Sequence, residues 1–222
     1  MILSIETSTK ACSVALHDNG QLVGLQYYFI QKSHSGLLPA VIKELLLNSN
    51  VEMKDLVAIA VSAGPGSYTG LRIGSSVAKG LAFTLDVPLI SVSSLDTMIS
   101  QVQPYLKEDY YLCPMIDARR MEVYCKLVSG VGEILWDTSP LIVDEITFTD
   151  FSEKELYLFG DGSVKFKDLL AKQGVKFLDD ITPSSKYMGQ IAFEKFTTNS
   201  FENLAYYEPD YLKEFQTKTA KS

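Results

Sequence analysis

The chain has 222 residues, of which 46% are hydrophobic and 21% are charged, an ordinary composition for a folded globular protein. Its 20 basic and 27 acidic residues give a net charge of −7, so we do not expect it to bind nucleic acid alone by neutralising phosphates. No apolar run approaches the roughly 18 residues of a membrane-spanning helix, and Met1 leads straight into an apolar strand without a basic leader. We therefore expect a cytoplasmic protein that does not bind membranes.

Cysteine and histidine usage predicts no metal centre. Cys12, Cys113 and Cys125 form no C-x-x-C pair, which is typical of reduced thiols. His17 and His34 are too few and too far apart for a zinc site of the usual spacing. The same shortage of ligands argues against a metalloprotease.

The first half of the chain is predicted to alternate strands with helices. Apolar runs and turn residues indicate strands over 2–5, 12–17, 22–29, 56–62 and 88–92, and helices over about 35–50, 71–85 and 94–103. This order is typical of an α/β structure. Pro104 marks the expected boundary between a first subdomain, residues 1–104, and a second, residues 105–222.

The second half begins the same plan again. Strands are predicted over 112–116, 123–128, 133–136 and 156–159, followed by helices over 164–172 and 184–197. Glu6 ends the first strand of the first half, and Asp117 ends its counterpart. In each half the next turn starts 12 positions later, at Asp18 and at Ser129. The equal offset predicts a duplicated domain; the alternative is a coincidence between two ordinary hairpins.

Two carboxylates at strand ends, one in each half, form the layout in which a nucleotide and its metal ion lie in a cleft. The loop after Glu6 is small and polar, whereas the loop after Asp117 is bulky and lacks glycine. We therefore predict a weak or lost nucleotide cleft with no bound cofactor, formed by Glu6, Thr7, Ser8, Asp117 and Arg119. The alternative is that both acids are hydrogen-bonded strand ends.

Residues 62–74 form a Gly-rich loop between a strand and a helix, a setting in which backbone N–H groups can bind an anion. No Lys followed by Ser or Thr closes the loop, so it is not a Walker loop. Its G-x-G-x-x-x-G spacing is also a poor dinucleotide fingerprint. A tight structural turn is the alternative interpretation.

The first half is also poor in charge, with 13 charged side chains in residues 1–104 against 34 in residues 105–222. The helix over 35–50 is apolar nearly all round, and the helix over 71–85 carries small residues at every fourth position. Such surfaces are covered, either by the rest of this chain or by another protein. We predict a partner-binding surface formed by Leu38, Val41, Ile42, Leu45, Gly70, Arg72, Ile73, Gly74, Val77, Ala78 and Leu81.

Several motifs together resemble the TsaB (YeaZ) family. They occur in colinear order and are Ile5-Glu6-Thr7-Ser8-Thr9, His34-Ser35 ahead of Leu37-Leu38-Pro39, the Gly-rich stretch 64–74, Asp117-Ala118-Arg119 before Glu122-Val123-Tyr124, and Glu208-Pro209-Asp210-Tyr211-Leu212. One departure is Glu6, where the family usually has Asp.

The resemblance implies the duplicated fold of actin, Hsp70 and sugar kinases (the ASKHA fold), with two subdomains. It implies a non-catalytic scaffold and activator of the TsaD transferase, which makes N6-threonylcarbamoyladenosine on tRNA next to the anticodon. TsaE would be the ATPase of the complex, tRNA would bind only through the complex, and the chain alone would form a homodimer. TsaD holds its metal with an H-x-x-x-H pair, and no second histidine lies near His34. An independent ATP-dependent kinase or ATPase of the same fold is the alternative.

Overall fold

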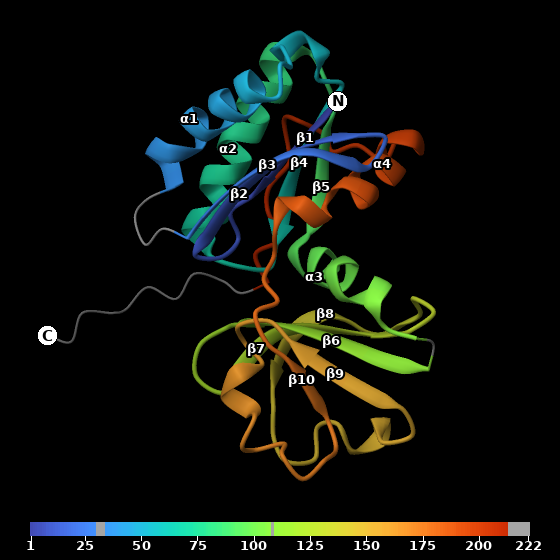
Figure 1. Ribbon diagram of the computed structural model, residues 1–222. Helices are drawn as coiled ribbons and strands as arrows, with labels where there is room; N and C mark the ends of the chain where they lie inside the picture. The colour runs from blue at the N-terminus through green and yellow to red at the C-terminus, as the bar shows by residue number, and fades with distance from the viewer. Residues whose placement is uncertain (30–33, 108, 213–222) are drawn as a thin grey trace, which may run out of the picture.

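The computed structural model describes residues 1–29, 34–107 and 109–212, which form two lobes, each built on a five-stranded sheet (Figure 1). The first sheet has the order β3-β2-β1-β4-β5 and the second the order β10-β9-β6-β7-β8. The strands are β1 (Ile2–Glu6), β2 (Ala11–Asp18), β3 (Gln21–Phe29), β4 (Ala58–Gly64), β5 (Leu89–Ser93), β6 (Tyr110–Asp117), β7 (Glu122–Ser129), β8 (Ile134–Ile142), β9 (Glu155–Phe159) and β10 (Lys176–Leu178).

The two sheets share one topology. In the first lobe β1 is central, antiparallel to β2 and parallel to β4; in the second lobe β6 is central, antiparallel to β7 and parallel to β9. The outer strands follow the same rule, since β3 and β8 pair antiparallel whereas β5 and β10 pair parallel. The predicted duplication is confirmed, and Glu6 and Asp117 end the two central strands.

The α-helices of the described residues are α1 (His34–Asn48), α2 (Tyr68–Leu85), α3 (Ser94–Val102) and α4 (Gly189–Thr197). Short 3-10 turns are η1 (Met53–Asp55), η2 (Gln103–Tyr105), η3 (Thr149–Phe151), η4 (Val164–Phe166) and η5 (Ser185–Tyr187). Within these residues we find no helix that is both long enough and apolar enough to span a bilayer.

The helix predicted over 164–172 is absent, because η4 is followed only by turns. Phe166 and Leu170 are buried against the second sheet, and Lys165 is bonded to the loop after β6. These tertiary contacts outweigh a local pattern that favours a helix, since intrinsic helix propensity is a weak effect.

Helices cover both faces of the first sheet (Figure 1). Leu3, Ile5 and Val61 face α1 and α2, whereas Ala58 and Ala60 face α4. The alternation along each strand is that of a sheet buried on both sides. Much of the charge-poor surface noted in the sequence is therefore covered by this chain itself.

The helix α3 lies between the lobes and packs on the second sheet (Figure 1). Its Leu95, Met98 and Val102 contact a face of that sheet, and Asp96 pairs with Lys126 of β7 at 2.8 Å. The lobes are thus joined by apolar packing and by an ion pair.

After β10 the chain returns to the first lobe, where Met188 and Ala192 are buried beside Ile2 and Ile90. The two sheets lie on either side of the expected boundary at residue 104, and part of the expected unit 105–222 packs on the first sheet. Residues 185–197 pack on the first sheet, and residues 213–222 lie outside the described residues. The apolar side chains of α4 pack on the first sheet. Nothing in the sequence of residues 105–183 indicates that the chain returns to the first lobe.

Candidate functional site

Glu6, at the end of β1, is fully buried, and its Oε1 accepts a hydrogen bond from the Ser8 amide at 2.6 Å. Its Oε2 has no hydrogen-bond partner among the described residues. Burial raises the pKa of Glu6, although hydrogen bonds from Ser8 and Ser62 act in the opposite direction. The carboxyl group therefore faces the protein interior rather than an open cleft.

The Gly-rich loop packs directly on the loop that follows Glu6. A Cβ on Gly66 would lie 2.3 Å from the Ser8 carbonyl oxygen, and a Cβ on Gly70 would lie 2.0 Å from that of Thr7. The Ser67 amide donates to the Ser8 carbonyl at 2.6 Å, and Thr7 Oγ1 donates to the Gly70 carbonyl at 2.8 Å. The glycines thus let two backbones touch, which favours the structural interpretation of this loop over an anion site.

Asp117, at the equivalent tip of the second lobe, is paired with a lysine. Its Oδ1 accepts from Lys165 Nζ at 2.6 Å and from the Arg119 amide at 2.9 Å. The same ammonium donates to the carbonyl oxygens of Arg120 and Glu122 at 2.8 and 2.6 Å. Partial burial raises the pKa of Asp117, but the ammonium and the amide outweigh it and hold the pKa below its usual value.

The predicted cleft residues therefore fall into two groups. Glu6, Thr7 and Ser8 lie together under the Gly-rich loop, whereas Asp117 and Arg119 lie in the second lobe with Lys165. Sequence reasoning missed Lys165 because it stood inside the helix predicted over 164–172. The turn Gly160-Asp161-Gly162 just before it was the available signal, since Asp161 Oδ1 accepts the Asp117 amide at 3.0 Å.

The predicted partner surface includes four residues of α1. Leu38, Val41, Ile42 and Leu45 are each at most 3% exposed and belong to the core between α1, α2 and the first sheet. A helix that is apolar on most sides is here covered by its own lobe. In this structure these four side chains therefore pack within their own lobe.

The small-residue stripe of α2 also faces the chain itself. Gly70 and Gly74 lie against Thr7, since a Cβ on Gly74 would lie 2.3 Å from Thr7 Oγ1. Ala78 is fully buried in the core shared with α1. Close approach of the chain's own loop and helix therefore already uses these three residues, and their predicted contact with a partner stays a prediction.

The remaining predicted residues lie nearer the surface. Arg72 is exposed and lies over the Tyr68 ring at 5.2 Å, whereas three α2 residues are half-buried at the edge of the core: Ile73, Val77 and Leu81. Large apolar side chains that sequence analysis did not single out are more open, with Leu47 75% and Phe83 80% exposed. We call the exposed side of the two helices the α1–α2 face, formed by Pro39, Ala40, Lys43, Leu47, Arg72, Ser76, Gly80 and Phe83.

His17 is buried, with Nδ1 3.1 Å from Ser4 Oγ and Nε2 3.2 Å from the Lys186 carbonyl oxygen. Burial lowers the pKa of His17. The side chain of His34 lies outside the described part of the chain. Among residues that the structure does describe, no three His, Cys, Asp or Glu side chains cluster in a way that could hold a metal ion.

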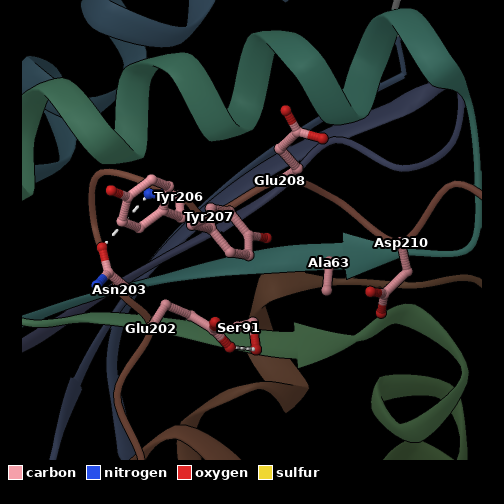
Figure 2. Close-up of a pocket in the computed structure, with 8 residues that line it drawn as sticks. All are labelled: Ala63, Ser91, Glu202, Asn203, Tyr206, Tyr207, Glu208 and Asp210. Carbon is pink, nitrogen blue, oxygen red and sulfur yellow. Dashed lines mark hydrogen bonds between the residues drawn. The ribbon is translucent and has the colours of Figure 1, made fainter.

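A pocket of about 330 Å³, not anticipated from the sequence, lies beside β4 and β5 (Figure 2). The segment after α4 forms much of its wall, and Glu202 accepts a hydrogen bond from the Ser91 hydroxyl at 2.5 Å. The lining residues are Ala63, Ser91, Glu202, Asn203, Tyr206, Tyr207, Glu208 and Asp210.

Known bacterial proteins are similar to this chain along nearly its whole length. The "tRNA threonylcarbamoyladenosine biosynthesis protein TsaB" of Escherichia coli is 31% identical over 219 residues, and the alignment covers 96% of this chain and 94% of that protein. The chain belongs to the TsaB family. The solved structure of YeaZ from Pseudomonas aeruginosa agrees, with a TM-score of 0.78, 25% identity and coverage of 95% of this TsaB chain and 99% of that chain.

Two further matches place this TsaB chain in a wider group. The family model described as TsaD, tRNA N6-adenosine threonylcarbamoyltransferase, matches residues 28–221. The activator of the 2-hydroxyisocaproyl-CoA dehydratase from Clostridium difficile, solved with bound ADPNP, has a TM-score of 0.50 at 12% identity over 90% of this chain and shares the fold alone. The predicted ASKHA fold is confirmed.

Proposed function

We propose that this chain is a non-catalytic subunit in the N6-threonylcarbamoyladenosine modification of tRNA, where it binds and activates a TsaD-type transferase. Its membership of the TsaB family is the observation that carries the proposal, since the E. coli relative is named for this pathway. The match of the TsaD model to residues 28–221 adds that chain and partner would share a fold. Two chains of one fold can pair corresponding helices about a pseudo-twofold axis.

The strand tips support a non-catalytic role. A kinase or ATPase of this fold would need carboxylates that hold Mg²⁺ and phosphates in line for transfer. Here Glu6 is buried against Ser8, and Asp117 is neutralised by Lys165. These contacts favour a binding subunit over an independent enzyme, and we assign the chain no nucleotide cofactor.

We assign the docking surface to the α1–α2 face. Leu47 and Phe83 are exposed apolar side chains on the two helices, and a Cβ added to Gly80 would meet nothing within 4 Å. Apolar side chains gathered on neighbouring elements mark sites that bind other proteins. In isolation the same face would pair two copies of the chain. A TsaE-type ATPase would then bind the assembled complex, which would also supply the contacts to tRNA.

The substitution Gly80→Arg tests this assignment. It leaves the lobe intact, because space is open around Gly80, but it places an unpaired charge in the proposed interface. Such a charge costs about 2 kcal/mol or more, so we expect at least about thirtyfold weaker binding to a TsaD homologue by calorimetry. Ser139→Arg, on exposed β8 of the second lobe, is the matched control and should bind as the wild type does. A folded Gly80→Arg variant with unchanged affinity would rule out this face.

A further inference from the structure

The pocket of Figure 2 is a built feature of the first lobe, independent of the strand tips and of the α1–α2 face. The segment 199–212 forms its outer wall and is bonded to the sheet at two points. The Glu202 amide donates to the Leu89 carbonyl at 2.9 Å, and the Asp210 amide donates to the Ala63 carbonyl at 2.8 Å. Because the wall is fixed on both sides, the cavity is part of the fold.

The side chains around this cavity include three carboxylates, those of Glu202, Glu208 and Asp210. The Ser91 hydroxyl already donates to Glu202, and Asn203 Oδ1 accepts the Ala205 amide at 3.1 Å. The Asp210 carboxylate forms no hydrogen bond or ion pair with any residue that the structure describes. Figure 2 shows the carboxylates of Glu202 and Asp210 on two sides of the pocket, whereas that of Glu208 points away toward α2.

The Tyr207 hydroxyl is a second, independent indication of a ligand. Tyr207 is only 7% exposed, and its oxygen makes no hydrogen bond of normal geometry with any described residue. The Ser75 hydroxyl of α2 lies beside it and interacts with it, and it has no other hydrogen-bond partner among the described residues. In Figure 2 the Tyr207 oxygen is directed toward the Ala63 side of the pocket. If its hydrogen turns to Ser75, its lone pair accepts from a donor in the pocket.

Two lysines lie near the pocket, and both are bonded to the backbone. Lys195 Nζ donates to the Ser91 carbonyl at 2.8 Å, and Lys79 Nζ donates to the Tyr207 carbonyl at 3.0 Å. The Lys79 ammonium also donates to the Ala205 carbonyl at 3.4 Å, so each ammonium is bonded to the backbone near the pocket. Burial and the nearby charge of Glu202 raise the pKa of Asp210, although Lys195 acts in the opposite direction. A further cation would add to the partial compensation that Lys195 gives this pair of acids.

We propose that this pocket binds the ammonium group of an organic amine, held by the carboxylates of Glu202 and Asp210 and by the Tyr207 hydroxyl oxygen. The exposed Tyr206 ring offers a cation–π contact. A bare metal ion fits less well, because the described side chains hold no group of three suitable ligands and because about 330 Å³ leaves room for an alkyl chain. The ammonium comes either from a free polyamine-like molecule or from a lysine of another protein.

Calorimetry with two probes tests the proposal and separates these sources. Putrescine represents the free amine, and Nα-acetyl-lysinamide represents a lysine side chain; both are titrated at physiological salt. We expect at least one probe to bind, and Glu202→Gln with Asp210→Asn to weaken that binding at least tenfold. Tyr207→Phe, which keeps the ring and removes only the hydroxyl, should also weaken it.

The control is the double variant Glu133→Gln with Asp137→Asn, which loses two exposed acids of the second lobe and leaves the pocket untouched. It should bind the probe as the wild type does. Equal loss in both double variants would mean general attraction to an acidic protein and would overturn the proposal. So would the absence of binding by either probe to a folded wild type.

Discussion

Glu6 and Asp117 occupy equivalent strand ends but lie in opposite environments. Burial raises the pKa of Glu6, whereas the Lys165 ammonium and the Arg119 amide outweigh partial burial and lower that of Asp117. The sequence placed both acids at strand ends because each follows an apolar run. The residues that surround each acid could not be predicted from the sequence, because they are distant along the chain. Lys165 lies 48 positions after Asp117, and the Gly-rich loop lies far from Glu6.

The raised pKa of Glu6 predicts a pH dependence. A buried acid of this kind contributes its full stability below the unfolded-state value of 4.5 and loses it as the pH rises through the folded-state pKa. We expect the unfolding free energy of Glu6→Gln to rise relative to that of the wild type between pH 5 and pH 8. Urea unfolding at both pH values measures this, and a pH-independent difference would contradict a buried, charge-penalised Glu6.

The lowered pKa of Asp117 predicts the opposite trend. Its contribution is present above the unfolded-state value of 3.8 and is lost as the pH falls through the folded-state pKa. Because the side chain is 46% exposed, we expect Asp117→Asn to cost at most about 1 kcal/mol at pH 7. Unfolding measured from pH 7 down to pH 3 should show the two proteins converge; a gap that persists in acid would exclude the ion pair as its source.

The helix α2 shows most clearly how one element serves both the fold and the surface. Gly70 lies against the Thr7 backbone, whereas Gly80, ten residues later, faces open space. The small-residue stripe predicts that another group comes close, and in this structure that group is the chain's own loop. The spacing of small residues predicts that another backbone packs closely against the helix. It does not indicate whether that backbone belongs to the same chain or to a partner.

Alanine at these two glycines should act in opposite directions. Gly70→Ala places a Cβ 2.0 Å from the Thr7 carbonyl oxygen, and we expect it to destabilise by about 1 to 3 kcal/mol. Gly80→Ala meets no atom and should stabilise by about 1 kcal/mol through helix propensity. Thermal unfolding of both variants checks the pair; equal melting temperatures would mean that the contact with Thr7 is not tight.

The other elements show which sequence signals suffice. Strand positions and the duplicated topology were predictable, because apolar runs and the turn at Asp18 are local signals. The segment 164–172 was not, because burial of Phe166 and the bonds of Lys165 depend on the second sheet. The pocket could not be predicted from the sequence either, because it forms only where the segment 199–212 packs beside β4 and β5.

At the scale of the whole molecule, two lobes share one plan, and the acids at their strand ends are buried, as Glu6 is, or paired with a lysine, as Asp117 is. The helix α3 and the ion pair of Asp96 with Lys126 join the lobes, and Tyr27 of the first lobe contacts Thr182 at 3.0 Å. The first lobe exposes the α1–α2 face to solvent, including the side chains of Leu47 and Phe83. This division of surfaces is what we expect of the proposed partner-binding subunit.

Reconstituted tRNA modification tests this account most directly. N6-threonylcarbamoyladenosine is quantified in tRNA incubated with a TsaD-type transferase, a TsaE-type ATPase and the adenylate-forming enzyme, with no further chain, the wild type, Glu6→Gln with Asp117→Asn, or Gly80→Arg. We expect full modification with the wild type and with the strand-tip double variant, and only background without the chain or with Gly80→Arg. Loss of modification in a double variant that still binds the transferase would show that these acids take part in the chemistry, and would contradict the account.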